Sequence, residues 1–109
     1  MDTRAMIKTL HLTLTKKWFD LILSGKKTIE YRECKPYWKA RLEGKSFDEI
    51  VFINGYGKDR PFMRVEFATM FKARVHYDTT GANGKIFNAN VNCYAIVLGE
   101  ILETRNIDD

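Results

Sequence analysis

The chain of 109 residues has few of the side chains that build metal centres or covalent cross-links. Its two cysteines, Cys34 and Cys93, lie far apart and form no C-x-x-C pair, so we expect reduced thiols. The two histidines, His11 and His76, are equally isolated, and no zinc-type ligand spacing is present. The sequence therefore predicts neither a metal site nor a cofactor.

Long apolar runs, repeats and low-complexity tracts are also missing. No run approaches the ~20 apolar residues that a membrane-spanning helix needs. Residues 1–6 include Asp2 and lack the apolar core of a secretory signal, so we expect a cytoplasmic protein with no membrane partner. No linker divides the chain, and its length suits one domain over residues 1–109.

The charge is unevenly distributed. The net charge is +4, but residues 1–45 contain eleven Lys/Arg and five Asp/Glu, whereas residues 46–109 contain seven and nine. A basic front half predicts a basic face, and a basic face favours a polyanionic partner. The alternative is an excess of charge that is merely solvated.

A helix is predicted over residues 16–24. Trp18, Leu21 and Ile22 recur there at helical spacing. Thr15 is a typical N-cap residue, and Gly25 is typical of the position just past a helix end.

Alternating apolar and polar residues predict the strands. Residues 62–78 form one long strand or two strands joined by a bend, and Gly99 marks a possible bulge. We expect a turn over 78–85, a loop with a short strand over 86–92, and a polar end that frays over 103–109. The predicted strands cover residues 6–14, 28–32, 48–53, 62–78 and 94–102.

The segment from residue 24 to 32 joins the helix to a strand and concentrates charge. Alternation from residue 28 places Thr28, Glu30 and Arg32 on one face, opposite Lys27, Ile29 and Tyr31. Lys26 and Lys27 follow the helix at the negative end of its dipole, which is a structural reason for a cation there. The cluster is either a binding site or a solvated strand face.

Aromatic residues stand among cations in the next segment. A short helix is predicted between Pro36 and Gly44. Tyr37 and Trp38 lie there between Lys35 and later cations, a pattern that suits base stacking beside phosphate contacts. Packing of Trp38 onto the core is the alternative.

The residues Gly25, Lys27, Glu30 and Arg32 fit the pattern G-x-K-x-x-E-x-R. This resembles the signature of the ASCH domain family, and the flanking segments agree over roughly residues 7–67. The resemblance implies an α+β, mostly β fold: a PUA-like small β-barrel of five or six strands with two short helices at its side. It also implies a cleft lined by the signature and an RNA or nucleotide ligand.

The resemblance leaves three functions open. As a binding module, the protein would contact phosphate or base edges through Lys26, Lys27, Thr28, Glu30 and Arg32 and stack bases on aromatics. As a hydrolase of RNA or of a modified nucleoside such as acetylated cytidine, it would use Lys27 and Glu30; Glu30 replaces the threonine nucleophile of the amidohydrolase branch, and Glu66 is a candidate glutamate only by position. As a protein-interaction module, it would keep Glu30 and Arg32 as an internal ion pair. The further candidate ligand contacts are Tyr37, Trp38, Asn54, Tyr56 and Lys58.

Overall fold

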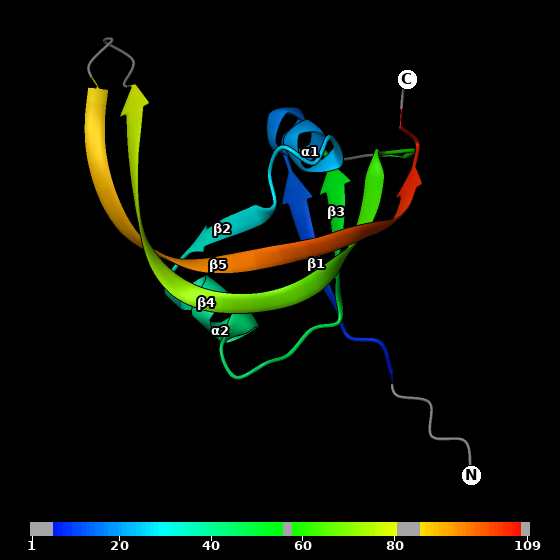
Figure 1. Cartoon of the computed structure of the whole chain (residues 1–109), viewed down its shortest axis with the longest axis horizontal. Coiled ribbons are helices and arrows are strands. Elements are labelled where there is room, and N and C mark those ends of the chain that lie inside the picture. Colours follow the sequence, from blue (N-terminus) through cyan, green and yellow to red (C-terminus); the bar gives the residue numbers. More distant parts are fainter. Residues whose placement is uncertain (1–5, 56–57, 81–85, 108–109) are drawn as a thin grey trace.

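The computed structural model describes residues 6–55, 58–80 and 86–107, without the side chains of 77–80 and 86–89. Five strands and two helices form a small α+β fold that is mostly strand (Figure 1). The elements in chain order are β1 Thr9–Leu14, α1 Lys16–Leu23, β2 Ile29–Glu33, α2 Pro36–Leu42, β3 Glu49–Asn54, β4 Phe62–Thr80 and β5 Ile86–Arg105.

All five strands join one mixed sheet in the order β1-β3-β4-β5-β2. β1 pairs with β3 in parallel, and the other pairings are antiparallel. The pairing does not close the sheet, because β1 and β2 stand at its two edges. Within the described part of the chain, neither helix is long and apolar enough to span a membrane.

Helix α1 follows the predicted pattern with two differences. Phe19 and Ile22 are buried, and Gly25 has a left-handed φ of 79°, as expected just past the helix end. Thr15 takes the N-cap position, but its side chain makes no capping hydrogen bond. Trp18 is 43% exposed, so this ring does not join the core despite its helical spacing.

The core lies between the helices and one face of the sheet. His11 points away from the buried leucines of β1, as predicted. Helix α2 contributes Leu42, and an ion pair of 2.5 Å between Lys72 Nζ and Glu43 Oε1 links the end of α2 to β4. The hydrogen bond from Lys72 lowers the pKa of Glu43 below its ordinary value. The buried core residues are Leu10, Leu12, Leu14, Phe19, Ile22, Leu42, Ile50, Phe52, Met63, Val65, Tyr94, Ile96 and Leu98.

Strands β4 and β5 form a long curved hairpin that extends past the rest of the sheet (Figure 1). Residues 62–78 belong to one continuous strand, which settles the choice between one strand and two. The predicted loop with a short strand over 86–92 is strand throughout, because cross-strand pairing with β4 extends β5 from Ile86 to Arg105. For the same reason the predicted fraying over 103–109 was wrong for 103–105, and residues 108–109 lie outside the described residues. Of the predicted turn, 78–80 are strand and 81–85 lie outside the described residues.

Irregular pairing bends this hairpin. Val65 faces Ile101, whereas Phe67 faces Leu98, so β5 carries an extra residue beside Gly99, as predicted. Thr69 then faces Val97, which places an extra residue in β4 near Ala68 and reverses the faces of the strand beyond it. Therefore the odd-numbered residues of β4 point into the core before the bulge near Ala68, and the even-numbered residues of β4 do so after it.

Position 99 requires glycine because strands β4 and β5 approach each other closely there. A Cβ atom added at Gly99 would lie 2.8 Å from the Cβ of Glu66, too close for two carbon atoms. Glu66 Oε1 also accepts a hydrogen bond from the backbone N–H of Glu100 at 3.0 Å, which fixes the bulge. This role is structural and lies outside the signature segment.

We expect Gly99→Ala to lower the free energy of unfolding by about 1–3 kcal/mol, the usual cost of overpacking. Denaturant unfolding followed by circular dichroism measures the change. Glu66→Gly removes the opposing Cβ, so the double variant should cost less than the sum of the two single changes. Purely additive costs would show that the close contact is not the reason for glycine at position 99.

Candidate functional site

A cleft of about 920 Å³ opens between the two edge strands of the sheet. β1 and the start of α1 form one wall of the cleft, and β2 and the start of α2 form a second. The part of the β4–β5 hairpin that extends past the rest of the sheet, which we call the hairpin arm, forms a third wall. The lining residues are Thr13, Leu14, Thr15, Lys17, Trp18, Lys27, Glu30, Tyr31, Arg32, Glu33, Lys35, Trp38, Val75 and Cys93.

A buried carboxylate, Glu30, lines this cleft. Glu30 pairs with Ile96 of β5 in a register that points its side chain to the core face, and it is only 5% exposed. Arg32 donates to Glu30 Oε2 from Nη2 at 2.6 Å and from Nε at 3.0 Å. Lys27 Nζ lies 3.6 Å from the other oxygen, Oε1. Each oxygen of Glu30 therefore faces a cation, as a buried charge requires.

Lys27 Nζ lies near both Glu30 and the Tyr31 ring, whereas alternation placed Lys27 with Tyr31 and opposite Glu30. Strand β2 begins at Ile29, so Lys27 precedes the strand and does not follow its alternating pattern. The backbone N–H of Lys27 donates to the carbonyl of Leu21 at 3.0 Å, which keeps this residue close to the end of α1. Its side chain then extends back to Glu30.

Aromatic rings flank the two cations. Lys27 Nζ lies 5.2 Å from the ring centres of both Trp18 and Tyr31. The Arg32 guanidinium carbon lies 4.9 Å from the ring centre of Trp38. These distances suit cation–π attraction. Glu30 is thus connected through its two cations to rings from α1, β2 and α2.

Helix α2 supports the Trp38 side of the cleft. Tyr37 and Trp38 make an edge-to-face contact with ring centres 4.9 Å apart. Arg41 lies near both rings, donates to the Tyr37 hydroxyl at 2.9 Å and donates to the backbone carbonyl of His11 at 3.2 Å. Trp38 packs partly on the core and lines the cleft, whereas Tyr37 is exposed outside the lining.

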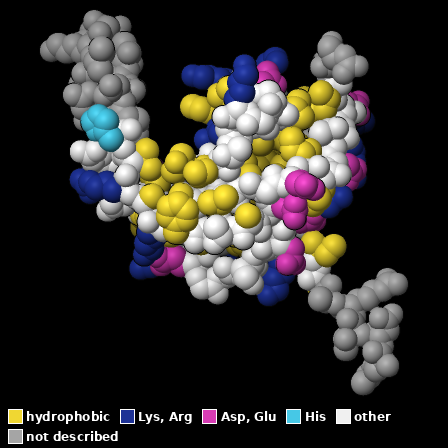
Figure 2. All heavy atoms as spheres, in the orientation of Figure 1, with side chains coloured by type: hydrophobic (Ala, Val, Ile, Leu, Met, Phe, Trp, Pro, Cys, Tyr) yellow, Lys and Arg dark blue, Asp and Glu magenta, His cyan; other side chains and the backbone are white. Residues whose placement is uncertain are grey.

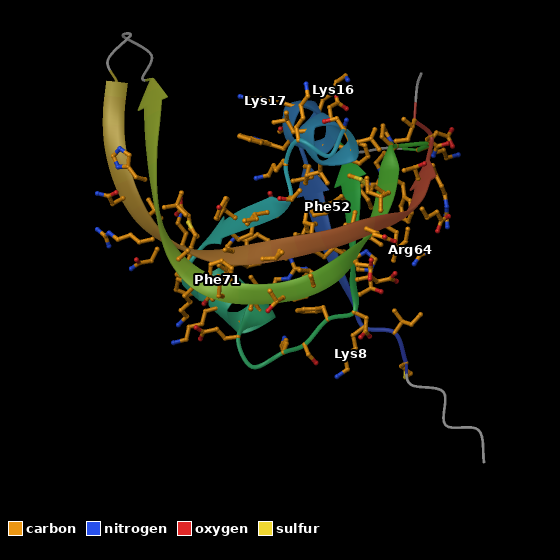
Figure 3. All side chains as sticks on the ribbon, in the orientation of Figure 1. Lys8, Lys16, Lys17, Phe52, Arg64 and Phe71 are labelled. Carbon is orange, nitrogen blue, oxygen red and sulfur yellow. The ribbon has the colours of Figure 1, made fainter. Side chains whose placement is uncertain are left out.

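Positive charge dominates the lining. Lys17, Lys27, Arg32 and Lys35 contribute four cations against the carboxylates of Glu30 and Glu33. Figure 3 shows Lys17 on α1. Such a lining attracts an anionic ligand.

Cys93 is the thiol that the described residues contribute to the lining. Burial raises the pKa of this thiol, and the carboxylate of Glu33 acts in the same direction. Cys93 therefore stays protonated near neutral pH and is a poor nucleophile. Cys34 and Cys93 are both free cysteines, as predicted. Among the described residues, no group of three or more His, Cys, Asp and Glu is placed to hold a metal ion.

A second buried carboxylate, Glu49, links strands of the sheet. It accepts a hydrogen bond from the Thr9 hydroxyl at 3.0 Å and pairs with Arg64 at 2.7 Å. Arg64 also pairs with Glu103 at 3.3 Å, so these contacts link β1, β3, β4 and β5. Glu49 does not line the cleft.

The structure brings together four of the predicted site residues: Lys27, Glu30, Arg32 and Trp38 all line the cleft. The other predicted residues with described positions are not in this lining. Lys26 and Thr28 are exposed beside the signature, and Asn54 and Lys58 lie at and beyond the end of β3. Tyr56 lies outside the described residues.

The sequence interpretation missed several cleft residues. Trp18 was assigned to a helix stripe, and Tyr31 to the opposite face of its strand. Lys17 and Lys35 were not selected as ligand contacts. Trp18 follows Lys17 directly, so the pairing of an aromatic with a cation was a signal that could have found it.

Comparisons of the chain with protein-family models, with curated proteins and with solved structures found no match.

We expect Glu30→Gln to lower the free energy of unfolding by about 3 kcal/mol, since two largely buried cations would lose their counter-charge. Glu33→Gln is the matched control, because Glu33 lies two residues away and pairs with the exposed Lys35. That change should cost under about 0.5 kcal/mol. Equal stability of the two variants in urea unfolding would show that Glu30 does not hold the cluster together.

Proposed function

We propose that this protein binds single-stranded RNA or its nucleotides in the cleft between β1 and β2. The observation that carries the proposal is the arrangement around Glu30. A buried carboxylate holds two cations, and three aromatic rings lie against those cations at the wall of a cationic cleft. Nucleotides combine a flat base with an anionic phosphate, and this lining offers a partner to each.

The proposed contacts follow from exposure and charge. Trp18 of α1 and Trp38 of α2 both line the cleft and offer ring surface to bases. Lys17 and Lys35 are exposed and reach phosphates at the rim. Glu30 Oε1 is 3.6 Å from Lys27 Nζ and accepts a hydrogen bond from a base N–H group, such as N3–H of uracil.

We also infer that the chain is an ASCH-type domain with a PUA-like fold. The support is the signature Gly25, Lys27, Glu30 and Arg32, three of whose side chains line the cleft, with two helices beside a five-stranded curved sheet. In this proposal the sheet is a barrel that stays open between β1 and β2, and the opening is the ligand cleft. The protein would act on RNA in the cytoplasm.

Binding is favoured over hydrolysis by the state of the candidate catalytic groups. Both oxygens of Glu30 face cations, and the hydroxyl of Thr28 lies outside the cleft lining. Glu66 is engaged with the β5 bulge. None of these three residues combines a free nucleophile with a place in the cleft.

Fluorescence anisotropy with a labelled eight-nucleotide oligouridylate tests the proposal. Two phosphate contacts predict that affinity falls about sevenfold between 50 and 200 mM salt. Lys17→Gln should weaken binding and flatten the salt dependence, because one phosphate contact is lost. Lys26→Gln is the matched control, since this exposed lysine lies outside the lining.

Two results would contradict this proposal. One is affinity that does not change with salt, and the other is an equal effect of Lys17→Gln and Lys26→Gln. The same samples are run on a denaturing gel, where we expect intact RNA. Cleaved RNA would identify a hydrolase.

A further inference from the structure

The outer face of β2, β5 and β4 is apolar although neither helix covers it. Solvent-facing sides of antiparallel sheets normally carry polar residues at alternate positions. Here Phe71 is 50% exposed and Tyr31 is 41% exposed, and Figure 2 shows hydrophobic side chains gathered over β4 and β5. The register assigns to this face Ile29, Tyr31 and Glu33 of β2, Val91, Cys93, Ala95 and Val97 of β5, and Thr69, Phe71, Ala73 and Val75 of β4.

The two exposed rings stand in one row across the sheet. Tyr31 pairs with Ala95, and Ala95 pairs with Phe71. Ala95 has no exposed surface, so the row has a low centre with a ring on each side. Strands lie about 4.8 Å apart, which places the two rings about 10 Å from each other. We call Tyr31 and Phe71 the two-ring platform.

The platform continues directly from the cleft. Tyr31 belongs to both, because it lines the cleft and its ring lies 5.2 Å from Lys27 Nζ. Val75 and Cys93 of the same face also line the cleft. A chain that leaves the cleft past Tyr31 therefore meets Phe71 next.

We propose that the two-ring platform stacks bases of a single-stranded RNA whose neighbouring nucleotides occupy the cleft. This inference rests on the proposed function and extends its site beyond the nucleotides that the cleft holds. Stacking on exposed sheet aromatics needs no charge on the sheet, and Glu33, the one charged residue of this face, already pairs with Lys35 at 3.0 Å. A spacing of about 10 Å exceeds the 3.4 Å between stacked nucleotides, so the bases are splayed apart, as in other single-stranded complexes.

A second copy of the chain fits this face less well. An interface over the whole face would cover Tyr31 and the adjoining walls Val75 and Cys93, and so would obstruct the cleft. RNA uses the face and the cleft together. Self-association through this face is therefore the alternative that the test distinguishes.

The test replaces Phe71 with leucine, which keeps an apolar side chain but removes the ring. Anisotropy compares labelled oligouridylates of two and eight nucleotides. Phe71→Leu should weaken binding of the eight-nucleotide RNA at least fivefold and leave binding of the dinucleotide unchanged within twofold. Phe71→Tyr restores a ring and should bind like the wild type, which separates stacking from a folding defect.

Each other outcome overturns the proposal in a recognisable way. If the wild type binds neither RNA, the proposed function fails and the platform fails with it. If the wild type binds both and Phe71→Leu changes neither, the cleft stands and the platform is refuted. If sedimentation shows a dimer that Phe71→Leu dissociates while RNA affinity is unchanged, the face is a protein interface.

Discussion

The buried carboxylate of Glu30 is the constraint on which the site depends. A charge that is 95% removed from solvent needs opposite charge beside it, and Lys27 and Arg32 supply this from two directions. Both cations point inward. Aromatic rings from three different elements therefore gather around them. The ion cluster thus fixes the relative positions of α1, β2 and α2, and the cleft is the space that they leave.

The shape of the long hairpin determines what surrounds the cleft. An extra residue in β5 beside Gly99 and another in β4 near Ala68 bend the pair and reverse which side chains of β4 face the core. Met70 therefore packs on the core while Phe71 is exposed. The same bend carries Val75 to the wall of the cleft, so local irregularities in pairing create both the third wall and the apolar outer face.

Local pattern was sufficient to predict what depends on local geometry. Alternation correctly placed Glu30 and Arg32 on one face, and the glycine after α1 has the expected left-handed conformation. The pattern failed for Lys27, because this residue precedes the strand and its amine reaches Glu30, three residues later. Helical spacing assigned Trp18 to the apolar stripe of α1, whereas its side chain is 43% exposed and lines the cleft. The strand over 86–92 pairs with β4, and its sequence does alternate, with Phe87, Ala89 and Val91 between three asparagines. The asparagines, which are uncommon in strands, concealed this alternation.

We propose that Trp18 and Trp38, on the α1 and α2 walls of the cleft, contact one RNA ligand. The chain has two tryptophans, Trp18 and Trp38, and both line the cleft. Their indole N–H signals in a ¹⁵N-labelled sample therefore report on the two walls separately. Titration with an eight-nucleotide oligouridylate should shift both signals with one common saturation curve. RNA binding that leaves both indole signals unmoved would contradict this proposal.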